Sequence, residues 1–242
     1  MKKLLVLLLV VASTIATAQE SVKLRLNYKK GDTYKMNMLM TQSSSVMGMT
    51  MNMKMNMAII DIIGDSYLTE MSFESMKMNM LQGGQEMNYD SEAKDEDLDP
   101  MGQMMKNQMG PILTVVVKGT LSKLGKMSDV TVTPDLPNTA DFTKTSSIAY
   151  PKESVIVGST WEKEEITQGM TIVMTYTVKE ITETKVNVNV TGASKGAAVA
   201  TITGSLEIEK ASGMPVLSII NTKISAGGQD VSMEVKTTMD KL

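Results

Sequence analysis

Between residues 47 and 57 every second residue is a methionine, and the residues between them are small or polar. Successive side chains of a β-strand point to opposite faces of a sheet, whereas a helix would scatter these methionines around its circumference. The segment is therefore predicted to be a β-strand with one face made of thioethers. We expect this face to point inward, because six exposed thioethers would form a continuous apolar stripe. The opposite, solvated face is formed by Thr50, Asn52, Lys54 and Asn56.

Apolar and polar residues alternate along much of the remaining chain as well. The alternation slips near Ala58 to Ile60 and near Glu74 to Ser75, where the apolar residues change sides. A one-residue slip predicts a β-bulge, and bulges bend sheets. We therefore expect an all-β, mainly antiparallel fold whose curved sheet is barrel-like or half-barrel-like. The expected strands lie at residues 22–26, 34–40, 47–62, 67–80, 87–89, 112–117, 170–178, 186–190, 202–208, 216–224 and 231–239.

One short amphipathic helix is expected at residues 99–109. Asp99 suits the N-cap and Pro100 suits the first helical position. Gly110 followed by Pro111 predicts the end of the helix. Four methionines recur at the spacing of one helix face, which we expect to pack on the methionine face of the sheet. They are Met101, Met104, Met105 and Met109.

The two halves of the chain share a short pattern. Residues 31–35 and 158–162 both read glycine, small polar residue, threonine, aromatic residue and charged residue, and each precedes an alternating strand. We interpret this as a duplicated β-meander, with an insertion in the first half that contains the methionine strand. The predicted organisation is a first meander at residues 19–133, a proline-containing linker at residues 134–151 and a second meander at residues 152–242.

The N-terminus resembles a signal peptide at residues 1–18. Lys2 and Lys3 precede an apolar run at residues 4–12, and Ala-Thr-Ala at residues 16–18 forms a cleavage signal. We expect an exported protein, periplasmic or extracellular, that is soluble after cleavage. The apolar run is too short to span a bilayer, and no later run predicts a transmembrane segment. The absence of cysteine excludes disulfides and an N-terminal lipid anchor on cysteine.

Composition narrows the function. The net charge is −3, Arg25 is the sole arginine and histidine is absent. This balance argues against a nucleic-acid partner, which needs basic surface. Without histidine or cysteine, the usual nucleophile pairs and zinc ligands are missing. We therefore expect no catalytic residues, no cofactor and no enzymatic activity, and the sequence leaves the oligomeric state open.

Eighteen of the 24 methionines after the initiator lie between Met36 and Met109. Methionine adapts its shape and is common on surfaces that accept varied apolar partners, so the leading hypothesis is a pocket for a lipid or another apolar molecule. Thioethers also select Cu(I), which makes an extracytoplasmic copper-binding protein the alternative. A purely structural or interaction role is the third possibility. The candidate lining set is Met36, Met38, Met40, Met47, Met49, Met51, Met53, Met55, Met57, Met76, Met78, Met80, Met101, Met104, Met105 and Met109.

An acidic loop at residues 90–99 begins like a calcium-binding loop. Pro100 stands where an EF-hand needs glycine, and Lys106 stands where it needs glutamate. The loop is therefore predicted to be a solvated acidic segment.

Three motifs carry a resemblance to a known family. They are K-x-G-D-x-Y at residues 29–34, Tyr-Asp-Ser at residues 89–91 and V-G-x-x-W at residues 157–161. Together with the signal peptide they resemble an uncharacterised secreted family of Bacteroidetes, a domain of unknown function. That resemblance implies no activity and transfers no site residue. The expected curved sheet with a helix is also similar to the lipoprotein-carrier fold, which holds acyl chains on a concave sheet.

Overall fold

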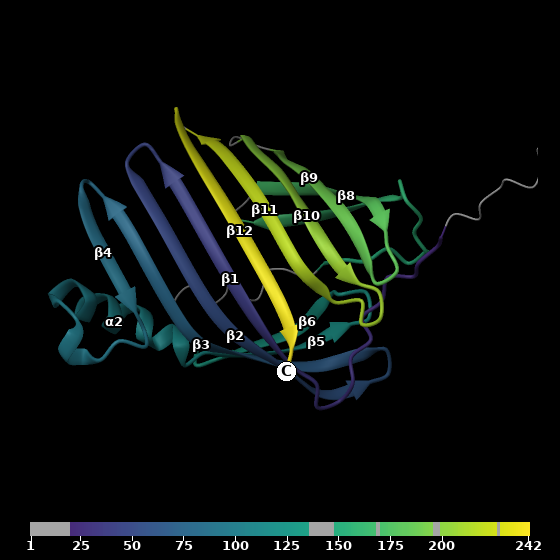
Figure 1. Ribbon diagram of the computed structural model, residues 1–242, viewed down its shortest axis with the longest axis horizontal. Helices are drawn as coiled ribbons and strands as arrows, with labels where there is room; N and C mark the ends of the chain where they lie inside the picture. The colour runs from purple at the N-terminus through teal and green to yellow at the C-terminus, as the bar shows by residue number, and fades with distance from the viewer. Residues whose placement is uncertain (1–19, 136–147, 168–169, 196–198, 227) are drawn as a thin grey trace, which may run out of the picture.

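The computed structural model describes residues 20–135, 148–167, 170–195, 199–226 and 228–242. The predicted signal peptide and most of the predicted linker lie outside these ranges. Within these ranges twelve strands form a single sheet, and every described pairing in it is antiparallel (Figure 1). The all-β prediction is therefore confirmed.

In the first half each strand pairs with the next strand along the chain, except that β4 pairs with β3 alone and β5 pairs with β3. Their bounds are β1 Thr33–Ser44, β2 Met47–Ile63, β3 Ser66–Gln82, β4 Gln85–Asp90, β5 Val116–Ser122 and β6 Met127–Thr133. Both β4 and β5 pair with β3, toward opposite ends of that long strand. A 3₁₀ turn, η1 Asp95–Asp97, and the helix α2 Pro100–Leu113 connect β4 to β5.

The second half is an uninterrupted meander. Its strands are β7 Thr160–Thr167, β8 Met170–Ile181, β9 Lys185–Lys195, β10 Val199–Glu209, β11 Pro215–Ala226 and β12 Gln229–Lys241. The last strand, β12, pairs with β1 and so joins the two meanders. Within the described residues β6 and β7 are the outer strands of this order, so the sheet is curled and half-barrel-like rather than a closed barrel.

Both expected bulges are present. The register of β2 against β3 shifts at Ile60, between the pairs Ile59–Thr69 and Asp61–Leu68. It shifts again at Glu74, between the pairs Met55–Phe73 and Lys54–Ser75. These extra residues bend the two long strands and reverse the side of the sheet to which later side chains point.

The helix starts as predicted but ends later. The Asp99 side chain accepts a hydrogen bond from the backbone N–H of Gly102 at 2.6 Å, which confirms the cap. The predicted end at Gly110 and the predicted strand start at Ile112 are wrong, because α2 continues to Leu113. Pro111 lies in the last turn, where it removes a single backbone donor, and Ile112 and Leu113 gain apolar contacts by remaining helical.

The segment before β1 is not a sheet strand, contrary to the prediction for residues 22–26. It makes one isolated bridge, between Val22 and Val155. Its backbone N–H groups at Leu26 and Asn27 donate instead to the carbonyls of Lys123 (2.9 Å) and Ser212 (2.8 Å), in two different hairpin turns. Residues 22–28, which we call the strap, bury alternate side chains in the core, namely Leu24, Leu26 and Tyr28.

Matching hydrogen bonds relate the two meanders. Gly31 and Gly158 have φ values of +86° and +87°, and their N–H groups donate to the carbonyls of Ile59 and Val178. The register shift that follows Ile59 in β2 recurs after Val178 in β8. The predicted insertion is misplaced, however, because the methionine strand β2 is the counterpart of β8. The added part is the stretch from β4 to α2, which lies between β3 and β5, whereas β9 leads directly to β10.

Each meander holds the other through a glycine turn. Gly125 and Gly213 both have positive φ. A Cβ atom on Gly125 would lie 2.0 Å from the backbone oxygen of Ile148, in the segment that precedes the second meander. A Cβ atom on Gly213 would lie 1.9 Å from the backbone oxygen of Arg25, in the segment that precedes the first meander. The N–H of Tyr150 donates to the Leu124 carbonyl beside the first of these turns at 2.8 Å. Glycine is therefore required at both turns by conformation and by space.

Replacing Gly213 with alanine tests this reciprocal packing. The matched control is Gly83→Ala, because Gly83 also has positive φ (+60°) but a Cβ atom there would meet nothing within 4 Å beyond its chain neighbours. We expect the control to lose about 1–2 kcal/mol of unfolding free energy from backbone strain alone. Gly213→Ala should lose roughly 1–3 kcal/mol more from overpacking. Urea unfolding measures both, and equal losses would contradict the close approach of the strap.

Candidate functional site

The strand register places the methionines of four strands on one side of the sheet. Met40 pairs with Met51, and Met51 pairs with Met78. In the next row Met38 pairs with Met53. Directly opposite side chains in antiparallel strands have Cβ atoms about 4.5–5.5 Å apart, so the thioethers form a continuous array. The array reaches β12 through the pairs Met36–Met239 and Met40–Val235.

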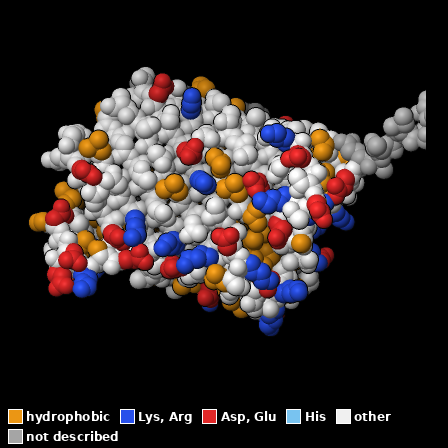
Figure 2. All heavy atoms as spheres, viewed as in Figure 1, with side chains coloured by type: hydrophobic (Ala, Val, Ile, Leu, Met, Phe, Trp, Pro, Cys, Tyr) orange, Lys and Arg blue, Asp and Glu red, His pale blue; other side chains and the backbone are white. Residues whose placement is uncertain are grey.

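The other side of the same strands is polar. Thr50 and Asn52 are exposed, Lys54 and Asn56 are half-buried, and Lys35 pairs with Glu74 at 2.9 Å. On the face shown in Figure 2, which includes β1 to β4 and β12, hydrophobic side chains are few and scattered. The methionine array therefore lies on the inner side of the curled sheet.

Helix α2 covers part of the array. Its Met105 is packed with Met53, Met76, Met78 and Tyr89, all of which are buried. We call these five buried residues the helix cluster. Further half-buried side chains pack around it. They are Met38, Met49, Met51, Met55, Phe73, Met109, Ile112 and Leu113.

The sixteen predicted lining residues fall into three groups by exposure. Met53, Met57, Met76, Met78 and Met105 are buried. Met104 is 44% exposed, so the expectation that it belongs to the buried helix face is wrong. The buried face of α2 follows Gly102 and Met105, and Met104 lies about 100° around the helix from Met105. The remaining ten are half-buried: Met36, Met38, Met40, Met47, Met49, Met51, Met55, Met80, Met101 and Met109.

A small apolar cavity of about 100 Å³ lies beneath the strap. Met36 and Met57 from the predicted set line it, and most of its other lining residues were missed by the sequence analysis. Their common feature is that they come from elements far apart in the chain, so only the alternation of Leu24, Leu26 and Tyr28 hinted at them. The cavity is lined by Leu26, Tyr28, Met36, Met57, Met71, Leu121, Gly125, Met127, Ile148, Tyr150, Pro215 and Met239.

Tyrosines fix the strap against the sheet beside this cavity. The rings of Tyr34 and Tyr67 lie 5.0 and 5.3 Å from that of Tyr28. The Tyr67 hydroxyl donates to the Leu26 carbonyl at 2.8 Å and accepts from the Tyr28 N–H at 3.3 Å. Burial raises the pKa of Tyr28 well above its ordinary value, so the hydroxyl stays neutral at physiological pH. The strap is thus held by the hydrogen bonds of the Tyr67 hydroxyl and by ring packing.

Asp32 lies at the edge of this tyrosine group. Burial opposes its ionisation, but hydrogen bonds from Lys241, from the Lys29 N–H and from the Tyr34 hydroxyl outweigh burial and lower the pKa of the carboxyl. The Lys241 Nζ lies 2.6 Å from Asp32 Oδ1. The ion pair connects the turn before β1 to the end of β12, where the two meanders join.

A second hollow, of about 480 Å³, lies where the polar sides of β2, β3 and β4 meet the acidic loop. Lys77 is paired there with Asp90 at 2.9 Å and with Glu92 at 3.2 Å. In the ranges that the structure describes, no group of three or more His, Cys, Asp or Glu side chains is arranged to hold a metal ion. The hollow is lined by Thr50, Asn52, Lys77, Met78, Asn79, Asn88, Tyr89, Asp90, Asp97, Leu98, Asp99 and Gly102.

Comparison with known proteins finds a similarity to a family model. Residues 138–216 match a family described as a family of unknown function, DUF6263. The match includes the V-G-x-x-W motif at residues 157–161 and covers β7 to β10, and it assigns no activity. No curated protein matches the chain. Among the described residues, no helix has the length and apolar character needed to cross a membrane.

The packing of α2 on the array predicts different effects for neighbouring methionines. Met105 is 6% exposed and Met104 is 44% exposed on the same helix turn. Met105→Ala should lower the free energy of unfolding by about 2–5 kcal/mol, as expected for a buried methionine. Met104→Ala should change it by no more than about 0.5 kcal/mol. Urea unfolding of both variants gives the comparison, and a small loss for Met105→Ala would mean that the helix does not depend on the array.

Proposed function

We propose that the protein is a non-enzymatic binding protein that holds an apolar small molecule, such as a lipid chain, on the inner face of its sheet. The observation that carries this proposal is the strip of half-buried thioethers on β1 and β2, namely Met36, Met38, Met40, Met51 and Met55. Met38, Met51 and Met55 pack against the helix cluster and Met36 lines the cavity beneath the strap, so the strip joins the two.

A purely structural face would be expected to be covered by a second layer of structure. Helix α2 contacts β3 and β4, and the strap packs at the end of the sheet that carries Met57 and Tyr67. Between them the inner side chains of β1 and β12, including Met40 and Val235, are half-buried rather than fully covered. Apolar surface gains about 25 cal/mol per Å² when it leaves water, so a bound apolar molecule would be stabilised on this strip.

The cavity itself is smaller than a typical ligand pocket of about 300–1,000 Å³. Its methionine lining offers a way to enlarge it, because unbranched thioether side chains change rotamer easily and fill irregular space. Four of the lining residues are half-buried methionines: Met36, Met71, Met127 and Met239. In this proposal the ligand lies along the strip with one end in the cavity.

Cu(I) binding is the second candidate. Met38, Met40, Met51 and Met53 form a square across β1 and β2, with two cross-strand pairs and two i, i+2 neighbours. Thioethers in such a square are the soft ligands that Cu(I) prefers. The array contains many equivalent squares, however, so it favours a general apolar surface over one defined metal site.

Native mass spectrometry of protein purified gently from its source tests both candidates. The apolar-ligand proposal expects a heavier species that loses an organic molecule on collisional activation. A species heavier by copper that survives competition with a Cu(I) chelator would instead support the metal candidate. A chain that carries neither, even after incubation with fatty acids and phospholipids, would contradict the proposal.

Neighbouring residues on β1 provide a matched pair of variants. Met38 belongs to the inner strip, and Leu39 is 38% exposed and, as the next residue of the strand, points to the other side of the sheet. Met38→Gln should weaken binding of the fluorescent apolar probe N-phenyl-1-naphthylamine roughly five- to tenfold, because it places a polar group among the thioethers. Leu39→Gln should leave the affinity within about twofold. Equal affinities of the two variants would place the probe elsewhere.

A further inference from the structure

The hairpin between β2 and β3 carries three exposed isoleucines. Ile60, Ile62 and Ile63 are 42%, 43% and 60% exposed. Beyond the bulges the two strands bend, and their hairpin protrudes at the lower end of the molecule (Figure 1). Ile62 pairs with Tyr67, whose side chain is buried on the inner side, whereas Ile63 pairs with Ser66 and points the other way. The hairpin is therefore apolar on both of its sides.

The duplicated meander shows that the strand pairing does not require isoleucine at positions 60 and 63. The register shift of the β2–β3 hairpin recurs in the β8–β9 hairpin, and the Thr182 N–H donates to the Lys185 carbonyl across the second turn, where Ile63 pairs with Ser66 in the first. Ile60 therefore corresponds to Lys179, Ile62 to Ile181 and Ile63 to Thr182. In the first hairpin the Asp65 carbonyl accepts a hydrogen bond from the Lys123 N–H. In the second hairpin the equivalent carbonyl, that of Thr184, accepts one from the Lys210 N–H. The strand pairing is the same in both hairpins, although their turns differ because Gly64 has a φ of +57°. The isoleucines at 60 and 63 therefore need an explanation other than strand pairing.

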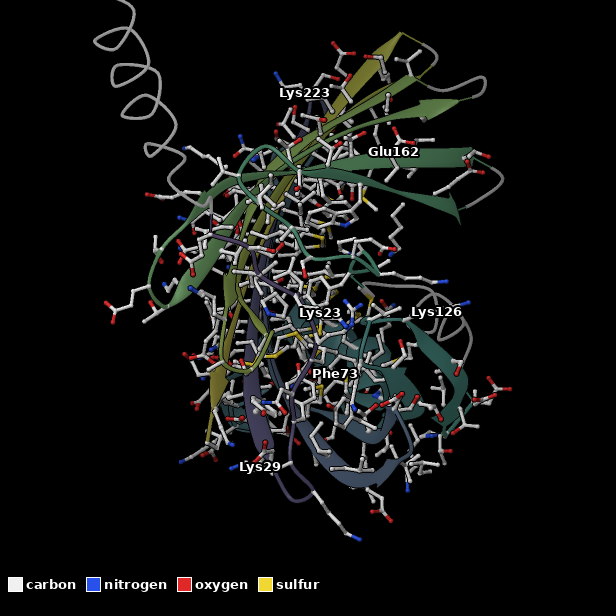
Figure 3. All side chains as sticks on the ribbon, turned by 90° about the vertical axis from the view of Figure 1, so that its right-hand side faces the viewer. Lys23, Lys29, Phe73, Lys126, Glu162 and Lys223 are labelled. Carbon is white, nitrogen blue, oxygen red and sulfur yellow. The ribbon has the colours of Figure 1, made fainter. Side chains whose placement is uncertain are left out.

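The charges around the hairpin remove a barrier to contact with lipid headgroups. At the tip of the hairpin, residues 60–66, both carboxylates are paired, Asp61 with Lys30 at 3.0 Å and Asp65 with Lys123 at 2.7 Å. Lys29 extends from the same end of the molecule (Figure 3). The hairpin thus presents aliphatic side chains, and beside them carboxylates that are paired with lysines and the further lysine Lys29.

We propose that this hairpin inserts into the surface of a phospholipid bilayer and that the apolar ligand passes between the bilayer and the inner face. A bilayer suits the hairpin better than a protein partner, because lipid surrounds a protruding element on both sides whereas a protein surface covers one. The tip is also close to the cavity along the chain. Met57 lines the cavity and lies three residues before Ile60. The passage of ligand rests on the proposed function, but the membrane contact is tested separately.

The test is flotation of the full chain with vesicles of phosphatidylcholine, and with an equimolar mixture of phosphatidylcholine and phosphatidylglycerol. The tip variant is Ile60→Thr with Ile63→Thr, which leaves the charge unchanged and, at position 63, introduces the residue of the second hairpin. The control is Val46→Thr with Val199→Thr, because these valines are 62% and 63% exposed elsewhere. Both variants are first shown to unfold at the same temperature as the natural protein.

We expect the natural protein and the control to float, and the partition coefficient of the tip variant to fall about tenfold or more. A natural protein that stays out of the vesicle fraction, or a tip variant that floats equally well, would overturn the proposal. So would sedimentation showing a dimer that the tip variant loses, since the tip would then bind a second copy. Binding of N-phenyl-1-naphthylamine is measured in parallel: a protein that floats without binding the probe retains the membrane contact and loses the proposed function.

Discussion

The pairing of β1 with β12 is the contact on which the rest of the structure depends. Eleven consecutive residue pairs, from Tyr34–Lys241 to Ser44–Val231, join the first strand of the chain to the last. Without this ladder the two meanders would be separate sheets, each with an additional unpaired edge. With it, the inner face is continuous from Met78 on β3 to Val235 on β12. The ion pair of Lys241 with Asp32 fixes the register at one end of the ladder.

The duplicated meanders use the same backbone plan for different inner surfaces. In the second half the inner face is built from branched residues that are almost fully buried, such as Val186, Val188 and Val190. In the first half β2 and β3 are each 17 residues long, against 12 and 11 for β8 and β9, and the added length carries methionine. The insertion of β4 and α2 then covers part of this longer face. One half is therefore a closely packed core, and the other keeps an adaptable and partly open surface.

The sequence predicted what short-range patterns decide. The period of two in residues 47–57 identified β2, the slips in alternation located both bulges, and Asp99 with Pro100 located the start of α2. The prediction for the end of α2 was wrong because it relied on the low helix propensity of Pro111. The contacts of Ile112 and Leu113 with the helix cluster determine where the helix ends. The strap was misjudged for a similar reason. Its alternation is that of a strand, but its hydrogen-bond partners, Lys123 and Ser212, are about 100 and 185 residues away and no local pattern reveals them.

The choice of methionine for the longer half follows from what a half-open face must tolerate. A branched side chain has few rotamers on a strand, so it stabilises one packing arrangement and leaves voids when that arrangement changes. Methionine is unbranched and has three rotatable bonds, so the same position can lie against α2, against another thioether or against a bound molecule. Met53 and Met76, buried beneath α2, and Met38 and Met51, half-buried beside them, show one residue type serving both situations within one cluster. The same chemistry makes the face sensitive to oxidants, because a sulfoxide would turn each apolar contact polar. An open thioether surface is therefore useful only where adaptability outweighs that sensitivity, as it would for the binding face proposed above.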